Sequence, residues 1–310
     1  MLDRVKEQAE GVRFLRRVVD GNLTTPLMLV GPEGTGRRLS VLEAAREMFG
    51  GGEHHDLLID EGKHPDLKVL VPESGKDLGV DAVRGLLRET IFFPVDAPKK
   101  FFVIDEADRM TPAASNALLK TLEEPPSTCR FFLLVQSADR VLPTIRSRCG
   151  VVQYRQLSES LVMSHLSRFE KDGTKALVYA RLAEGSIGRA VSLWGSGRLT
   201  LRDQVLGLLK TGLSGDTSSL FSTVDGLQSE LPLGLRFLEH VVQDLLMLPY
   251  CSERLTNLDV VDSLTDLRAQ MGDARLRKLR EGLKSLLGKT YLTTLPFHTK
   301  TFLADVLEGG

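Results

Sequence analysis

The sequence predicts an α/β fold: a parallel five-stranded sheet with helices on both faces, followed by an all-helical C-terminal half. Three observations predict it. Short apolar runs alternate with helical patterns over roughly the first 150 residues, which is typical of a parallel sheet between helical layers. A glycine-rich segment, 31–38, lies between one apolar run and a helical pattern. After Leu157 no convincing strand follows.

The elements follow from the spacing of apolar residues. Apolar residues at helical spacing predict helices over 2–20, 37–49, 80–90 and 111–124. Thr111 and Pro112 fit the cap and the first position of the last of these helices. The predicted strands are 25–30, 67–71, 101–104, 131–136 and 151–154.

The remaining segments complete the predicted layout. Residues 50–60 are rich in glycine and histidine, and they are predicted to be a loop. Residues 158–195 form a small helical unit, and Gly195–Leu199 is a plausible hinge. Residues 200–308 hold several amphipathic helices, including 231–247 and 274–287.

The composition restricts the class of protein. The chain has 310 residues and a net charge of -1, so nucleic-acid contact would need a local basic patch. Its three cysteines are widely spaced and predict no disulfide framework, which favours a reducing, cytoplasmic setting. Neither a signal peptide nor an apolar run of membrane-spanning length is visible.

The glycine-rich segment has the spacing of a phosphate-binding loop. Gly31, Gly34 and Gly36 fit G-x-x-x-x-G-K-[ST], but Arg37 stands at the lysine position and Arg38 at the hydroxyl position. In that motif the lysine reaches the β- and γ-phosphates and the hydroxyl binds Mg²⁺. We therefore expect weak or no nucleotide binding and no useful hydrolysis by this chain alone.

An acidic pair follows the predicted third strand. Asp105 and Glu106 end a buried run downstream of the glycine loop, where a nucleoside triphosphatase places its Mg²⁺-binding aspartate and its water-polarising glutamate. The pair argues mildly for retained activity. A solvated acidic turn is the alternative interpretation.

Three sequence strings resemble one family. Residues 115–126 (SNALLKTLEEPP) and 142–149 (LPTIRSRC), with His64-Pro65-Asp66, strongly resemble bacterial clamp-loader ATPases of the AAA+ class. The likeness is strong over about residues 10–195 and only architectural beyond them. It implies an AAA+ nucleotide-binding-like domain over 1–156, a helical lid over 157–197 and a helical collar domain over 198–310.

The resemblance also implies roles for individual residues. Arg148 matches the family's arginine finger, which acts in trans on the γ-phosphate in a neighbouring subunit, and Arg146 is the less favoured candidate. Ser137 matches the polar sensor position, although its neighbours depart from the usual pattern. In the lid, the phosphate-sensing arginine is displaced by one residue to Arg189, which rotates its side chain by about 100°.

Within this family the chain is most similar to the delta-prime class of DNA polymerase III subunits. The altered glycine loop, the displaced Arg189 and the short length separate it from motor subunits. The likeness implies a hetero-pentamer with motor subunits and a delta-like subunit, which loads a sliding clamp on primed DNA. The chain would touch the clamp only indirectly. It would belong to a nucleotidyltransferase holoenzyme without having polymerase activity.

Cofactors and DNA contacts follow from the same likeness. ATP and Mg²⁺ would lie at the interface with a neighbouring subunit. Zinc is not expected, because the family's four-cysteine module is absent and His54, His55, Asp56 and His64 look like polar loop residues. Arg84 and Arg88 share a helix face that contacts DNA phosphates or is simply solvated.

Two other functions stay open at this point. The chain could be an active small clamp-loader ATPase, bacterial or phage, that tolerates arginine in its loop. It could also be an AAA+-derived adaptor outside replication. An ATPase rate abolished by Glu106→Gln would favour the first, and failure to bind any motor subunit or clamp would favour the second.

Overall fold

The computed structural model describes residues 2–73, 75–227, 230–288 and 294–308 of the chain. The chain divides into two units, residues 1–158 and 159–310. Among the described residues no helix is long and apolar enough to cross a membrane.

The first unit is built on a five-stranded sheet in which every neighbouring pair is parallel. The strand order is β2-β3-β4-β1-β5. This confirms the predicted parallel sheet, and each strand lies within two residues of its predicted bounds. The strands are β1 (Leu27–Val30), β2 (Leu67–Leu70), β3 (Lys100–Ile104), β4 (Cys129–Val135) and β5 (Gly150–Gln153).

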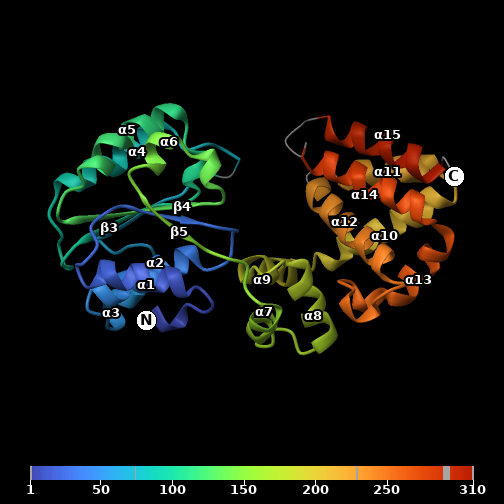
Figure 1. Cartoon of the computed structure of the whole chain (residues 1–310), viewed down its shortest axis with the longest axis horizontal. Helices are drawn as coiled ribbons and strands as arrows, with labels where there is room; N and C mark the ends of the chain where they lie inside the picture. Colours follow the sequence, from blue (N-terminus) through green and yellow to red (C-terminus); the bar gives the residue numbers. More distant parts are fainter. Residues whose placement is uncertain (1, 74, 228–229, 289–293, 309–310) are drawn as a thin grey trace. The chain divides into compact units, whose positions relative to one another are not determined.

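Two helical layers cover the sheet (Figure 1). Every residue of the three central strands is buried, as expected when both faces of a parallel sheet are covered. Successive residues alternate between the layers: Phe101 packs on one side and Phe102 on the other. One layer holds α1 (Ala9–Val19), α2 (Arg37–Met48) and α3 (Glu53–Asp60). The other holds α4 (Val80–Arg88), α5 (Pro112–Glu123) and α6 (Pro143–Arg146).

One loop prediction and one helix prediction are wrong in part. Residues 50–60 were expected to be a loop, but 53–60 form α3, whose first turn carries Glu53 and Asp56 at the favourable end of the helix dipole. The predicted helix 2–20 is interrupted: a short 3₁₀ turn, Leu2–Arg4, precedes α1, and Glu7 between them has a left-handed φ of 57°.

The second unit is entirely helical in its described part, as predicted. The break between α9 and α10 contains Gly197 and falls within the predicted hinge segment. The helices are α7 (Glu159–Leu166), α8 (Gly173–Leu182), α9 (Ile187–Gly195), α10 (Leu199–Leu213), α11 (Thr217–Leu227), α12 (Leu231–Met247), α13 (Val261–Gln270), α14 (Asp273–Leu287) and α15 (Leu295–Glu308).

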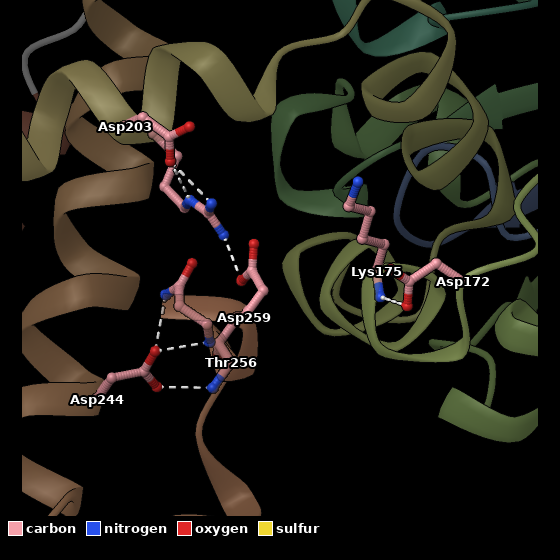
Figure 2. A network of polar contacts seen from close by, with 8 residues as sticks. Asp172, Lys175, Asp203, Asp244, Thr256 and Asp259 are labelled. Atoms are coloured by element: carbon pink, nitrogen blue, oxygen red, sulfur yellow. Dashed lines mark hydrogen bonds and ion pairs between the residues drawn. The ribbon is translucent and has the colours of Figure 1, made fainter. Parts of the chain in front are cut away.

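A buried polar network organises the loop between α12 and α13 (Figure 2). The Asp244 carboxylate accepts hydrogen bonds from the backbone amides of Thr256 (2.7 Å) and Asn257 (2.8 Å). The guanidinium of Arg202, in α10, contacts Asp259 at 2.6 Å and Asp203 at 2.8 Å. From α8, Arg181 donates to the carbonyl oxygens of Glu253 and Leu255 in the same loop.

Candidate functional site

The glycine loop connects β1 to α2 in the manner a phosphate-binding loop requires. Gly36 caps α2 with a left-handed φ of 99°, a conformation that favours glycine. At Gly31 a Cβ atom would lie 2.2 Å from the backbone oxygen of Tyr154, so the close approach of β5 excludes any side chain. The hydroxyl of Ser40 donates to the Gly36 carbonyl at 2.7 Å, within its own helix.

Arg37 lies inside the site. It is 6% exposed, and its Nη1 is buried with no hydrogen-bond partner among the described residues. Burial lowers the pKa of Arg37, and the nearby carboxylates of Asp105 and Asp108 oppose this shift. A guanidinium nevertheless stays charged in a protein, so Arg37 brings an incompletely compensated positive charge to the loop.

Arg38 reaches the acidic pair. Its Nη1 lies 3.8 Å from Oδ2 of Asp105, the residue that follows β3. Burial raises the pKa of the Asp105 carboxyl, while the hydrogen bond from the Glu106 amide and the charge of Arg38 lower it in part. The carboxylate that a metal ion would use therefore has a guanidinium as its neighbour.

The side chain of Glu106 is held in place by Arg109. The backbone of Glu106 has a left-handed φ of 49°, unusual for a residue with a side chain, and such strain concentrates at functional sites. Its carboxylate accepts a hydrogen bond from Arg109 Nη1 at 2.8 Å. Arg109 also donates to the carbonyl of Lys76 and lies 3.7 Å from Asp77. The structure thus brings the loop arginines close to Asp105 of the acidic pair.

Arg148 lies at the other end of the same strands. It precedes β5, whose Gly150 pairs with Leu27 at the start of β1, whereas the glycine loop follows the end of β1. Its Nη2 is 3.2 Å from Glu123 Oε2, and its Nη1 donates to the Thr144 carbonyl at 2.9 Å. It borders a pocket of about 460 Å³ that Thr24, Thr25, Pro26 and Ser147 also line.

The neighbours of Arg148 in the sequence have separate environments. Arg146 is 52% exposed and forms an ion pair with Asp139 at 3.3 Å. Burial raises the pKa of the Cys149 thiol to about 12, so this cysteine is a packed thiol and not a nucleophile. Ser137 uses its hydroxyl to accept a hydrogen bond from the Asp139 amide at 3.3 Å, as the cap of a 3₁₀ turn.

Arg189 belongs to the second unit. Ser186 caps α9 by accepting from the Arg189 amide at 3.0 Å. The guanidinium of Arg189 pairs with Glu184 at 2.7 Å, and Glu184 also lies 3.6 Å from His240. The side chain is therefore engaged within the helical unit.

The histidine cluster is structural at its centre. His64 lies in the loop after α3 as expected, but it is 1% exposed and its ring lies 4.6 Å from that of Phe49, so it is buried. His54, His55 and Asp56 were also expected in a loop, but they stand in α3. Nδ1 of His64 accepts from the Asp66 amide at 3.1 Å, and its Nε2 lies 2.9 Å from His55 Nδ1. Burial lowers the pKa of His64. No group of three or more His, Cys, Asp or Glu side chains in the described ranges is placed to hold a metal ion.

Three residues support the site without having been assigned a role from the sequence. Buried Gln8 donates to the carbonyls of Thr35 in the glycine loop and Arg155 after β5, at 3.2 and 2.7 Å. Asp66 accepts three backbone hydrogen bonds from the segment 95–97. Glu123 pairs with Arg148. Gln8 belongs to no recognisable string, whereas Asp66 and Glu123 lie within the strings 64–66 and 115–126 but carried no separate signal of their own.

Arg84 and Arg88 are both exposed on α4, as their spacing predicted. Segment 91–95 after this helix is also exposed, with Phe93 at 80% and Phe92 at 61%.

Comparison with known proteins identifies the family. A family model described as "DNA polymerase III, delta subunit" matches residues 8–158. The delta-prime subunit of DNA polymerase III from Escherichia coli is 34% identical over 241 residues, which are 74% of this chain and 72% of that protein. This chain belongs to the delta-prime family of clamp-loader subunits.

This delta-prime family member is also similar to other proteins. Replication factor C subunit 4 from Homo sapiens is 28% identical over 278 residues, 83% of this chain and 72% of that protein. A DNA polymerase III gamma subunit-related protein from Thermotoga maritima matches the fold with a TM-score of 0.54 at 17% identity, covering 96% of this chain and 98% of that one. The expected AAA+ architecture is therefore confirmed.

Proposed function

We propose that this clamp-loader subunit supplies Arg148 as an arginine finger to the ATP site of a neighbouring motor subunit. Through that contact it takes part in ATP-dependent loading of a sliding clamp on primed DNA, within a hetero-pentamer that includes a delta-like subunit. The chain contributes to ATP hydrolysis without hosting it.

The observation that carries this proposal is the position of Arg148 just before β5, relative to the two ends of β1. β1 has four residues, so at about 3.3 Å per residue its two ends lie about 10 Å apart. Arg148 stands near the first end and the glycine loop follows the second. Arg148 thus lies at the opposite end of β1 from its own loop and is 30% exposed, which suits a guanidinium that acts on another chain's phosphate.

The residues of the glycine loop support the proposal that the chain's own nucleotide site is degenerate. Arg38 places its charge beside Asp105, and the hydroxyl of Ser40 is committed to its own helix. These donors do not fit a Mg²⁺ ion, which requires oxygen ligands in near-octahedral geometry. Since metal-assisted charge neutralisation contributes several kcal/mol to phosphoryl transfer, we infer little or no ATPase activity at this loop.

A second candidate, an active small clamp-loader ATPase, rests on the Asp105–Glu106 pair. The pair stands beside the loop at the end of β3, but Arg109 engages the Glu106 carboxylate. If the isolated chain hydrolysed ATP and Glu106→Gln abolished that activity, this candidate would replace the first.

The test is the ATPase rate of the cognate motor subunits with clamp and primed DNA, in complexes containing wild-type chain or Arg148→Ala. A trans finger contributes roughly 10³-fold or more at its site, so we expect Arg148→Ala to abolish the share of the rate that this site provides. Arg148→Lys should recover little, because it lacks the planar fork.

The matched control is Arg146→Ala, which removes an exposed arginine from the same string and should leave the rate unchanged. Size-exclusion chromatography verifies that each complex assembles. Equal rates for Arg148→Ala and Arg146→Ala complexes would show that Arg148 is not the finger.

A further inference from the structure

The Arg148 guanidinium is already occupied by an acceptor of the same chain. Nε and Nη2 of Arg148 both face Oε2 of Glu123, at 3.4 and 3.2 Å, and Nη1 donates to the Thr144 carbonyl. A guanidinium has five N–H donors, and each of its three nitrogens is engaged here. A phosphate cannot take the Nε–Nη2 edge of Arg148 while Glu123 holds it.

The position of Glu123 in its helix is informative. It is the last residue of α5, where a negative charge faces the negative end of the helix dipole. A glutamate there gives the helix no stabilisation of its own. The contact that compensates for it is the one with Arg148.

The pair is also easy to open. The Glu123 side chain is 60% exposed and that of Arg148 is 30% exposed, and ion pairs of this kind are weak and easily exchanged. A phosphate carries more charge than a carboxylate and offers several oxygens. The adjacent pocket, which Thr24, Thr25 and Ser147 line together with Glu123 itself, gives an approaching anion a polar entry to the pair.

We propose that Glu123 is a positioning residue that masks Arg148 until the γ-phosphate of a neighbour's ATP displaces it. The guanidinium exchanges one acceptor for another, and the carboxylate withdraws because it would oppose the charge that develops on the phosphate. This inference rests on the proposed finger role of Arg148. It makes the affinity of the completed site depend on a residue that never touches ATP.

The variant Glu123→Gln, assembled into the full complex, tests whether Glu123 masks Arg148. With the competing charge removed, we expect the apparent KM for ATP to fall about two- to five-fold while kcat is unchanged, a range set by the weakness of exposed pairs. Glu124→Gln is the matched control, since it removes an exposed glutamate at the next position and should leave both parameters unchanged. An unchanged KM for Glu123→Gln, or a fall in kcat, would overturn the proposal.

A second measurement does not depend on ATP hydrolysis. An arginine-selective dicarbonyl reagent, followed by peptide mass spectrometry, reports how accessible Arg148 is in the free chain. Modification of Arg148 should be faster in Glu123→Gln than in wild type or Glu124→Gln, and equal rates would refute the mask. If Arg148→Ala leaves the ATPase rate intact while labelling still responds to Glu123→Gln, the finger role fails and the contact alone stands.

Discussion

At the scale of single residues, the surroundings of each arginine decide what it does. Arg37 is buried, with one nitrogen that has no hydrogen-bond partner in the described part of the chain. Arg38 extends to Asp105, and Arg148 is partly exposed and paired with Glu123. The first two replace a lysine and a hydroxyl, the groups that bind phosphate and Mg²⁺ in an intact loop. The third stands at the opposite end of the same strands.

Restoring those two groups should restore metal-dependent binding. In Arg37→Lys/Arg38→Ser the serine hydroxyl and the freed Asp105 carboxylate supply oxygen ligands beside the loop. We expect a fluorescent ATP analogue to bind the double variant at least about tenfold more tightly with Mg²⁺ than with EDTA, and wild type to show no such difference.

Fluorescence anisotropy measures both affinities. The single variant Arg37→Lys is the control, because it leaves Arg38 beside Asp105 and should not acquire the Mg²⁺ dependence. A double variant indifferent to Mg²⁺ would show that something other than Arg38 disables the metal site.

At the scale of elements, the local sequence pattern predicts a helix or strand correctly where contacts with distant parts of the chain do not change it. Each β-strand was predicted because its apolar run fits a buried strand. Helix α3 was missed because three successive glycines, 50–52, precede it and dominate the local signal. The predicted first helix fails at Glu7 because Gln8 is fixed by Thr35 and Arg155, a contact between segments far apart in the sequence.

The candidate site likewise contains residues that the sequence revealed and partners that it did not. The loop glycines, Asp105 and Arg148 were found because they belong to strings with recognisable spacing. The partners of these residues, such as Glu123 for Arg148 and Arg109 for Glu106, depend on how helices and turns pack, which a single sequence does not encode locally.

Asp66 shows how one residue organises an element. Its buried carboxylate accepts the amides of Val95, Asp96 and Ala97 at 2.8, 2.8 and 2.9 Å. Asp66→Ala would leave these donors unpaired, so we expect the free energy of unfolding to fall by about 3 kcal/mol. Urea denaturation measures it.

The exposed neighbour provides the comparison, since Asp96→Ala keeps the backbone donors paired with Asp66. Asp66→Asn should lose less stability than Asp66→Ala, because an amide oxygen still accepts. A loss for Asp66→Ala as small as that for Asp96→Ala would mean that the three hydrogen bonds contribute nothing net.

At the scale of the whole molecule, one arginine of the helical unit, Arg181, holds a helix and a distant loop together; we call this contact the tether. The predicted lid, apart from its first two residues, and the predicted collar fall within one unit, 159–310. Arg181 of α8 holds the loop before α13 through the Glu253 and Leu255 carbonyls, and it also contacts Glu159 at 3.0 Å. The hinge at 195–199 stays a prediction, and this tether would restrain it.

Removing the tether should loosen that loop. Arg181→Ala deletes two hydrogen bonds to backbone carbonyls, worth roughly 1–2 kcal/mol together, so amide exchange in 252–258 should accelerate about 5- to 30-fold. Hydrogen–deuterium exchange with mass spectrometry measures this. Arg198→Ala, which removes a part-exposed arginine paired with Glu230, should leave the exchange of this loop unchanged.

The raised pKa of Cys149 has a practical consequence for thiol chemistry. With a pKa of about 12, the Cys149 side chain is almost entirely a neutral thiol at neutral pH. Cys129 is fully buried, and burial raises its pKa as well. Cys149 and Cys251 are both partly exposed, but the raised pKa of Cys149 disfavours its thiolate, so Cys251 in the helical unit is left as the preferred site for a maleimide dye. A native chain labelled there would report on clamp-loader assembly with Arg148 and its neighbours chemically intact.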